Sequence, residues 1–455
     1  MTDEIAPGVR RMRPDDHFMV LSENDTSPMH VGALVFLEVP EAERGGLLGR
    51  LRDHFAARLP ATPLLARLVQ APDGYDSDVW ADVAAADPDA HFVRENTPTP
   101  DAASLNAAVA RLNMVRLDLA RPPFKLHLFD ALPGDCAAFY VKMHHCVADG
   151  IGFQEVLRLL SDDCPSVPAR TADVVLPSRE AWLAQAEARF AAEEPLRAAD
   201  SARRKAALAA IEAIKGERAR TPVLGLSGPT SPARSYVPMS IALAPFKAAA
   251  KALGATVNDL FLACAAQAMR SYLLEIGDLP DQPLVVNSAR SYRRPEHGPY
   301  GNRIVALHPH LATHIADPME RLRAIQASMA AELRRSPLDE AMLGALERPY
   351  GARDRRETFA RRSDDGGRLL PGNLSLSNVP GPAGKRSFAG YRQRHNFPVP
   401  IIGSGRFFNI TSRRSGDNLD MGVMADAEKI PDAARPAVLF REALTQYAAF
   451  ASAQN

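Results

Sequence analysis

The sequence predicts two mixed α/β domains joined by a helical connector. Three observations lead to this prediction. The chain has 455 residues, more than one hydrophobic core usually supports. Strand-like and helix-periodic apolar segments alternate in both halves, and between the halves the composition shifts to Ala, Glu and Arg. We therefore expect an N-terminal domain over residues 1–180, a helical connector and linker over 181–234, and a C-terminal domain over 235–455.

In the first half, apolar runs predict a strand over 31–38 and a helix over 47–59. Residues 126–129 predict a second strand, a Pro-Gly turn over 132–135 follows, and the apolar run 137–143 predicts a third strand. The two later strands should pair as an antiparallel hairpin. A helix is expected over 152–160.

The connector is expected to be helical over 183–215, with an interruption near Pro195 because proline removes a backbone N–H from a helix interior. Its charged composition fits either a solvated surface helix or an inter-domain helix. The stretch 220–235, which is rich in Pro and Gly, predicts a linker.

The second half repeats the mixed texture of the first. The charged stretch 339–367 is expected to be partly mobile. The remaining pattern predicts a strand over 235–243, helices over 245–253 and 258–276, strands over 284–290 and 301–307, and a final helix over 431–449.

Composition narrows the class of protein. The 54 basic and 54 acidic residues give a formal net charge of +0, so no overall field attracts nucleic acid. The four cysteines show no metal-type spacing, and the polar N-terminus lacks an apolar signal segment. Both features favour a reducing cytoplasm. No run reaches the roughly 18 apolar residues of a membrane span. Contact with the inner face of a membrane or with lipid inclusions would therefore be peripheral.

The segment from His144 to Gly150, with the sequence HHCVADG, carries most of the chemical information. It directly follows the predicted strand 137–143. Because side chains alternate along a strand, His145 should share a face with the apolar side chains of that strand. Burial there would keep the imidazole neutral, which is the form that accepts a proton near neutral pH. We therefore predict that His145 is a catalytic base and that His144 braces it or hydrogen-bonds the backbone. Glycine at position 150 would let a substrate pass close to the backbone.

Asp149 has two interpretations. It can cap the helix that follows, or it can pair with a distant arginine and so fix the turn that carries His145. The histidines also have two non-catalytic interpretations, as structural core residues or as metal ligands. Neighbouring histidines on a strand point in opposite directions, and no Cys or carboxylate cluster joins them, so no metal is expected.

Several segments together resemble the bacterial wax ester synthase/diacylglycerol acyltransferase family, a branch of the CoA-dependent acyltransferase superfamily. The HHxxxDG pattern alone indicates only the superfamily, whereas the combination indicates the family. The resemblance runs almost end to end, and its segments are Pro28–Gly32 (PMHVG), His144–Gly150, Thr256–Asp259, Val286–Arg290 with Gly301 and Asn302, and Ser377–Pro382 (SNVPGP).

The resemblance implies an α+β fold of two domains like chloramphenicol acetyltransferase. Each would be a mostly antiparallel sheet flanked by helices, with an active-site tunnel between them. The resemblance also implies that His145 is the general base in this tunnel and that acyl-CoA and the alcohol enter from opposite sides. Asp149 would be structural and would pair with Arg290.

Four further positions are candidates for the polar groups that support the substrate. Helix-cap and turn chemistry explains such residues without any ligand, with Asn258 as an N-cap. These candidates are Asn258, Asp259, Ser377 and Asn378.

We therefore expect an O-acyltransferase that esterifies a long-chain alcohol or diacylglycerol to wax ester or triacylglycerol, with acyl-CoA as co-substrate and no cofactor. Two alternatives remain open. One is a condensation-type enzyme with a carrier-bound acyl donor, and the other is a non-catalytic lipid-binding protein. Contact with a membrane or lipid droplet would use the basic stretch 331–335 or the apolar stretch 342–346, although packing explains both equally well.

Overall fold

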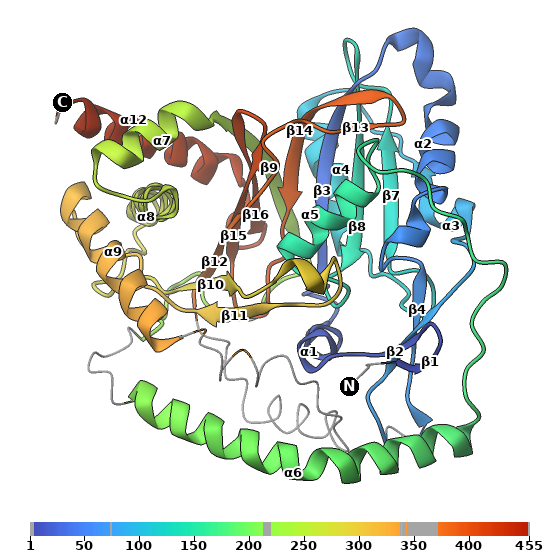
Figure 1. Ribbon diagram of the computed structural model, residues 1–455. Coiled ribbons are helices and arrows are strands. Elements are labelled where there is room, and N and C mark those ends of the chain that lie inside the picture. The colour runs from blue at the N-terminus through green and yellow to red at the C-terminus, as the bar shows by residue number, and fades with distance from the viewer. Residues whose placement is uncertain are drawn as a thin grey trace.

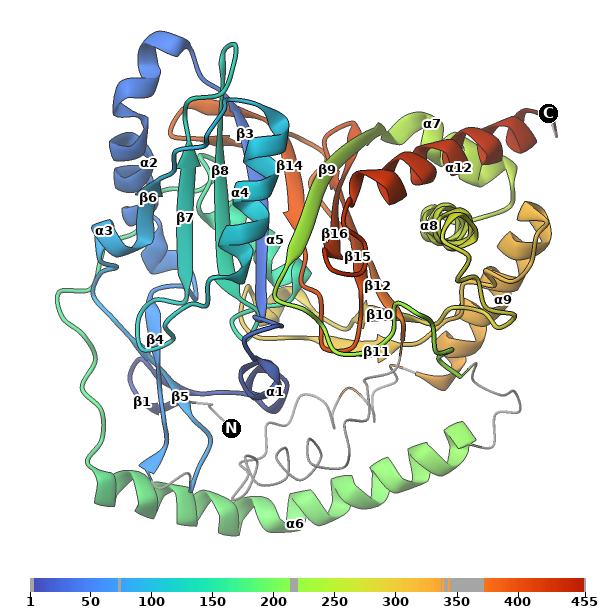
Figure 2. The same cartoon turned by 180° about the vertical axis from the view of Figure 1, so that it is seen from behind.

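Two six-stranded sheets lie side by side at the centre of the molecule, and a four-stranded sheet lies below the first of them (Figures 1 and 2). The computed structural model describes residues 4–72, 75–212, 220–336 and 372–453, together with the single residues 338 and 343. The two-domain α/β architecture predicted from the sequence is therefore confirmed.

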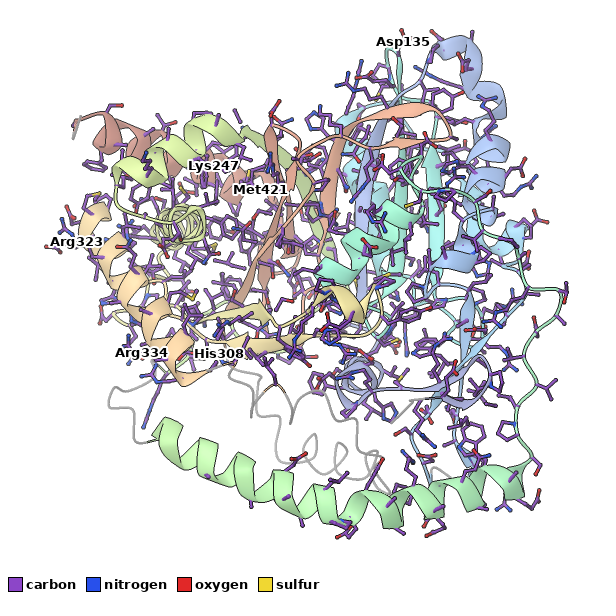
Figure 3. The ribbon with its side chains drawn as sticks, in the orientation of Figure 1. Asp135, Lys247, His308, Arg323, Arg334 and Met421 are labelled. Carbon is purple, nitrogen blue, oxygen red and sulfur yellow. The ribbon has the colours of Figure 1, made fainter. Side chains whose placement is uncertain are left out.

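The first sheet holds the predicted hairpin. Its strands, in order across the sheet, are β13 (Ser387–Phe388), β14 (Tyr391–Val399), β3 (His30–Glu38), β8 (Cys136–His144), β7 (Phe124–Phe129) and β6 (Phe92–Arg94). All neighbours are antiparallel except β6 and β7. Strand β8 pairs with β3 along its whole length, so that His144 lies opposite His30. Asp135 marks the tip of the β7–β8 hairpin, at the end of β8 remote from His144 (Figure 3).

Side-chain alternation along β8 gives the sheet two apolar faces. Phe139, Val141 and Met143 pack in one cluster with α2 (Leu47–Ala56) and α5 (Gly150–Leu159). Tyr140 and Ala138 face the other way and pack against α4 (Ala102–Met114) and against residues of the second sheet. β8 ends at His144, however, and His145 begins a turn. The side-chain alternation of β8 therefore does not extend to His145.

The second sheet is built from the later part of the chain. Its strands, in order, are β11 (Ile304–Leu307), β10 (Val286–Ser291), β12 (Leu374–Val379), β15 (Phe408–Ser415), β16 (Asn418–Asp426) and β9 (Arg234–Ala242). Its outer face carries α7 (Leu243–Ala252), α8 (Val257–Glu275), α9 (Pro318–Arg335) and α12 (Ala434–Ala453) (Figure 1). Residues from these helices and from the sheet form the largest apolar cluster of the molecule.

A segment from the later part of the chain crosses into the first sheet. β13 and β14, which come from residues 387–399, join the first sheet, where β14 pairs with β3. Where β14 approaches β16, a Cβ atom added at Gly422 would lie 1.7 Å from the carbonyl oxygen of Pro398. Only glycine permits this approach of the two backbones. The boundaries predicted at residues 180 and 234 remain predictions, but the sequence did not indicate this crossing.

The long helix α6 (Arg179–Glu212) runs below both sheets (Figures 1 and 2). The predicted interruption at Pro195 is wrong, because the helix continues through it. Pro195 is exposed, so water can satisfy the carbonyl group that loses its helical partner. The start of α6 is fixed to a loop of the four-stranded sheet, where Trp182 Nε1 donates to Asp76 Oδ2 at 3.2 Å.

The small sheet and the remaining helices complete the fold. The stretches expected to be mobile (339–367) or to contact lipid (342–346) lie outside the described residues, apart from residue 343.

Among the described helices, none is by itself long and apolar enough to cross a bilayer. By length and composition, α7 and α8 together meet those criteria, with a 93° bend between them. The small sheet has the order β1 (Glu4–Ala6), β2 (Val9–Arg11), β5 (Val79–Asp82), β4 (Ala66–Val69), and the other helices are α1 (Pro14–Ser22) and α3 (Pro88–His91).

Candidate active site

The turn that carries His145 is held by both halves of the chain. The backbone N–H of His145 donates to the Met29 carbonyl oxygen, just before β3, at 2.7 Å. Its carbonyl oxygen accepts a hydrogen bond from Asn302 Nδ2 at 2.8 Å. A parallel bridge between Ala148 and Gly301 adds a third connection. Because these contacts fix the backbone, the imidazole is placed by the fold rather than by its own side-chain contacts.

The two ring nitrogens of His145 are in different environments. Nδ1 is fully buried and has no hydrogen-bond partner among the described residues. The residue as a whole is partly exposed, and Nε2 is not among the buried nitrogens that lack a partner. Burial lowers the pKa of His145, and its own backbone carbonyl, Asp149 and Asn302 only partly oppose this effect. The imidazole is therefore neutral near pH 7, as a general base requires.

His144 is enclosed and makes no contact with open space. Its Nδ1 accepts the backbone N–H of Cys146 at 3.1 Å, so the ring proton sits on Nε2. That nitrogen lies 3.5 Å from Glu23 Oε1. Across the strand pair, the rings of His30 and His144 meet edge to face at 5.9 Å. The bracing role of His144 stays a prediction.

Glu23 is a buried carboxylate that the sequence analysis did not find. It faces two imidazoles, with His30 Nε2 at 3.6 Å and His144 Nε2 at 3.5 Å, and it pairs with Arg116 at 2.8 Å. Burial alone would raise the pKa of Glu23, but its contacts with His144 and Arg116 lower it to about 2. No motif contains Glu23, and only the fold brings it beside His144 at the end of β8.

Asp149 performs both of the roles that the sequence left open. Its Oδ1 caps α5 by accepting the Gly152 N–H at 2.8 Å, and its Oδ2 accepts the Arg303 N–H at 2.8 Å. The same carboxylate forms an ion pair with Arg293, whose Nη2 lies 3.0 Å from Oδ2. Both oxygens therefore have two partners each, because Arg293 Nε also reaches Oδ1 at 3.2 Å.

The predicted pairing of Asp149 with Arg290 is wrong. Arg290 lies inside β10, opposite Val305 of β11, and its guanidinium donates to the Ser336 carbonyl oxygen at 3.0 Å. β10 ends at Ser291, and the chain then turns toward the Asp149 side. Arg293 lies beyond this strand end and can reach the carboxylate.

Asn302 connects the turn to the N-terminal helix α1. Its backbone N–H and its Nδ2 donate to Asp16 Oδ1 at 2.6 and 2.7 Å, while Nδ2 also holds the His145 carbonyl. Burial raises the pKa of Asp16 to about 7, although the hydrogen bonds from Asn302 oppose it. Gly301 has φ +67°, and a Cβ atom there would lie 2.9 Å from Asp16 Oδ2. Gly301 and Asn302 therefore lie where α1, the His145 turn and the segment after β10 meet at close distance.

Gly150 lies at a contact between the two halves of the chain. A Cβ atom at Gly150 would lie 3.0 Å from Cγ2 of Val379, so this close neighbour is a side chain of β12. On the same strand, Asn378 Oδ1 accepts the Ser412 hydroxyl at 3.0 Å, and the Ser377 carbonyl oxygen lies 3.4 Å from that hydroxyl. The SNVPGP segment is thus placed against the start of α5 through Val379, whereas the contacts given for Ser377 and Asn378 are with Ser412.

Asn258 and Asp259 sit at the start of α8. Thr256, not Asn258, is the N-cap, because its side chain accepts the Asp259 N–H while the Asp259 carboxylate accepts the Thr256 N–H. Within the described residues, no hydrogen bond or ion pair connects Asn258 or Asp259 to the His145 turn. Their substrate contact remains a prediction. Likewise, no group of three or more His, Cys, Asp or Glu side chains in the described ranges is arranged to hold a metal ion.

Comparison with known proteins covers nearly the whole chain. The family model of the wax ester synthase/diacylglycerol acyltransferase catalytic domain matches residues 12–261, and that of the WS/DGAT C-terminal domain matches residues 300–448. Two proteins of Mycobacterium tuberculosis, provisionally named diacylglycerol O-acyltransferases, are similar in sequence. One is 30% identical over 93% of this chain and 96% of its own length. The other is 29% identical over 97% of each.

Solved structures share the fold. The wax ester synthase/diacylglycerol acyltransferase of Marinobacter aquaeolei VT8 superposes with a TM-score of 0.70 at 22% identity, over 97% of this chain and 99% of that one. The first condensation domain of the calcium-dependent antibiotic synthetase superposes with a TM-score of 0.60 at 16% identity, over 97% and 96% of the two chains. These likenesses extend over both sheets.

Proposed function

The chain belongs to the wax ester synthase/diacylglycerol acyltransferase family, and we propose that it transfers a long acyl chain from acyl-CoA to a long-chain alcohol or diacylglycerol. The observation that carries this proposal is the His145 imidazole. It is neutral, the residue is partly exposed, and its turn is fixed by both halves of the chain. Its products would be a wax ester or triacylglycerol.

In the proposed reaction His145 acts as general base and then as general acid. Nε2 takes the hydroxyl proton of the alcohol while the alcohol oxygen forms a bond to the thioester carbonyl carbon. The tetrahedral intermediate then collapses, the C–S bond breaks, and the proton passes from Nε2 to the CoA thiolate. Such proton transfer contributes on the order of 10²- to 10⁴-fold to the rate. The thioester is already activated, so no covalent acyl-enzyme is needed.

His144 and Asp149 have positioning roles in this proposal. The Nδ1 of His144 is occupied by a backbone N–H, which leaves His144 no accessible lone pair for a substrate. Both carboxylate oxygens of Asp149 are already bound, to the backbone N–H groups of Gly152 and Arg303 and to the Arg293 guanidinium. Neither side chain is free to bind substrate, but each fixes one flank of the turn that carries His145.

The condensation-type alternative has one supporting observation, the likeness of this fold to condensation domains. The two reactions differ in the acyl donor. In one the thioester is attached to a carrier protein, and in the other it is attached to coenzyme A, which contains a nucleotide.

The lipid acceptors also suggest a peripheral position at a membrane or lipid inclusion. Co-sedimentation with phospholipid vesicles at low salt tests that position, and failure to co-sediment would exclude it.

A thiol-release assay tests the proposal. Purified protein is given palmitoyl-CoA with hexadecanol or diacylglycerol, and the same acyl group on N-acetylcysteamine or on a carrier protein. We expect thiol release with acyl-CoA that depends on the lipid acceptor. Faster turnover with the carrier-bound donor would favour the condensation-type alternative. Acyl-chain binding without thiol release from any donor would indicate a non-catalytic lipid-binding protein.

A further inference from the structure

A pocket lies beside the turn that carries His145, on the side of Val147. This small pocket of about 100 Å³, partly open to solvent, lies between the small sheet, α1 and the segment 300–303. Val147 of the HHxxxDG turn forms part of its wall, as does Gly301, whose N–H donates to the Val147 carbonyl oxygen at 2.8 Å. The pocket and the His145 turn therefore share backbone.

Four arginines line this pocket, and three of them have identifiable neighbours. Arg10 donates to Asp82 at 2.6 Å. Arg11 lies 3.7 Å from Asp76. Arg13 lies beside Asp16, whose carboxylate is engaged by Asn302.

Arg303 is the exception. Its side chain is buried, with the residue only 8% exposed, and its Nε and Nη1 have no hydrogen-bond partner among the described residues. The structure also gives no ion pair for it within those ranges. Its backbone N–H, by contrast, is bound to Asp149. The backbone is thus anchored at the catalytic turn while the guanidinium lies unpaired at the pocket wall.

A buried guanidinium without a counter-ion is costly, because its desolvation is not offset by an opposite charge. Such groups persist where a ligand supplies the missing charge, and functional sites commonly retain groups of this kind at the expense of stability. Arginine is suited to phosphate, which its planar fork binds through two parallel hydrogen bonds. An anion would supply the opposite charge that Arg303 lacks.

Two aromatic rings give the pocket a second chemical character. Trp80 of β5 lies opposite Arg10 of β2 in the small sheet, and both line the pocket. Tyr300 is exposed and receives the Arg10 guanidinium over its ring at 5.1 Å. Guanidinium groups and aromatic faces together fit a ligand that carries both phosphate and a flat heterocycle.

We propose that this pocket binds a phosphate group of the acyl-CoA nucleotide, with Arg303 as the principal phosphate ligand and the rings of Trp80 and Tyr300 beside the base. The inference rests on the proposed function, since it assumes a CoA thioester. It assigns the donor to the flank of the turn that contains Val147, from which the pantetheine arm leads toward His145. The acyl acceptor then approaches from elsewhere.

The test compares Arg303→Met with Arg323→Met. Methionine keeps the bulk of the buried side chain and removes its charge, whereas Arg323 is an exposed residue on the outer side of α9, away from the pocket (Figure 3). For Arg303→Met we expect the KM for palmitoyl-CoA to rise about 10- to 100-fold, the loss typical of a charge-assisted hydrogen bond. With palmitoyl-N-acetylcysteamine, which has no nucleotide, its kcat/KM should change less than about twofold. Arg323→Met should match the wild type with both donors.

Calorimetric binding of CoA, 3′-dephospho-CoA and inorganic phosphate tests the pocket without turnover, so it stands even if no acyl transfer occurs. We expect CoA binding to weaken to the same extent in Arg303→Met and to recover only in part in Arg303→Lys, which keeps the charge but not the planar fork. Equal weakening with both thioesters, or unchanged CoA affinity, would overturn the proposal. So would a variant that loses binding to phosphatidylglycerol vesicles but not to CoA, because the site would then serve a lipid headgroup.

Thermal melting separates a binding role from a structural one. Removing an unpaired buried charge should leave the melting temperature of Arg303→Met equal to or above that of the wild type, and CoA should raise it only in the wild type. An Arg303→Met protein that fails to fold would contradict the premise that this charge has no partner in the protein.

Discussion

Arg293 and Asp149 form a buried ion pair between the two halves of the chain, with 3.0 Å between Nη2 and Oδ2. Their side chains are 5% and 2% exposed. Asp149 begins α5 in the first half, and Arg293 follows β10 in the second. The pair therefore fixes the catalytic turn and the contact between the halves at once, which makes stability and activity sensitive to the same residue.

Arg293→Met should destabilise the protein by about 3 kcal/mol, because it leaves the Asp149 carboxylate buried without its counter-charge. The matched variant Arg290→Met should cost less than about 1 kcal/mol, since Arg290 is only partly buried and loses one hydrogen bond to a carbonyl. Urea unfolding measures both. A larger loss for Arg290→Met would refute the assignment of Arg293 as the partner of Asp149.

Glu23 should make a large contribution to stability against acid. Its pKa is lowered to about 2 in the folded protein, so its stabilising effect is present above the unfolded pKa of about 4.5 and is lost as pH falls toward about 2. This corresponds to about 3 kcal/mol. Unfolding free energies at pH 7 and pH 3 should differ less in Glu23→Gln than in the wild type. Equal pH dependence would show that Glu23 has no special partner in the fold.

Asn302→Ala should lower both stability and turnover. The side-chain Nδ2 holds the His145 carbonyl and Asp16, and both acceptors stay buried after the change. We expect a loss of about 2 kcal/mol in unfolding free energy. We also expect a fall in kcat of about tenfold, because the His145 backbone gains freedom. An unchanged kcat in a destabilised variant would mean that the junction supports the fold but not the position of His145.

The pH dependence of kcat/KM should report the neutral imidazole. Burial lowers the pKa of His145, so the base stays deprotonated below the ordinary histidine value of 6.5 and activity falls only at lower pH. Initial rates between pH 4.5 and 8 measure this. An inflection near pH 7 that disappears in Asp16→Asn belongs to Asp16, whose pKa is about 7. An acid limb above 6.5 that persists in that variant would contradict the buried neutral base.

Local sequence pattern predicted the elements of the fold well. The hairpin ending at His144 and the strand 31–38 were visible because apolar alternation and a Pro-Gly turn are local signals. The crossing of β14 into the first sheet was not visible, since strand partners depend on the path of the whole chain. The helix break predicted at Pro195 was wrong, because solvent exposure, which the sequence does not show, decides whether a helix tolerates a proline.

The candidate site also combines residues that the sequence revealed with residues that it did not. His144, His145 and Asp149 occur in one short motif, and their spacing revealed them. The partners of that motif come from distant segments without a recognisable pattern. Arg293 lies three residues beyond the arginine predicted to pair with Asp149, and Glu23 is an ordinary acidic residue in sequence. Only the geometry of the strand ends determines which arginine reaches the carboxylate.

The central claim is that the His145 imidazole takes the proton of the acceptor hydroxyl, and single-turnover thiol release from palmitoyl-CoA with His145→Ala tests it most directly. Because Nδ1 of the ring has no hydrogen-bond partner among the described residues, removal of the ring should leave the melting temperature close to that of the wild type. We predict that the rate falls at least about 100-fold in this folded variant. A folded His145→Ala protein that releases thiol at the wild-type rate would contradict the account.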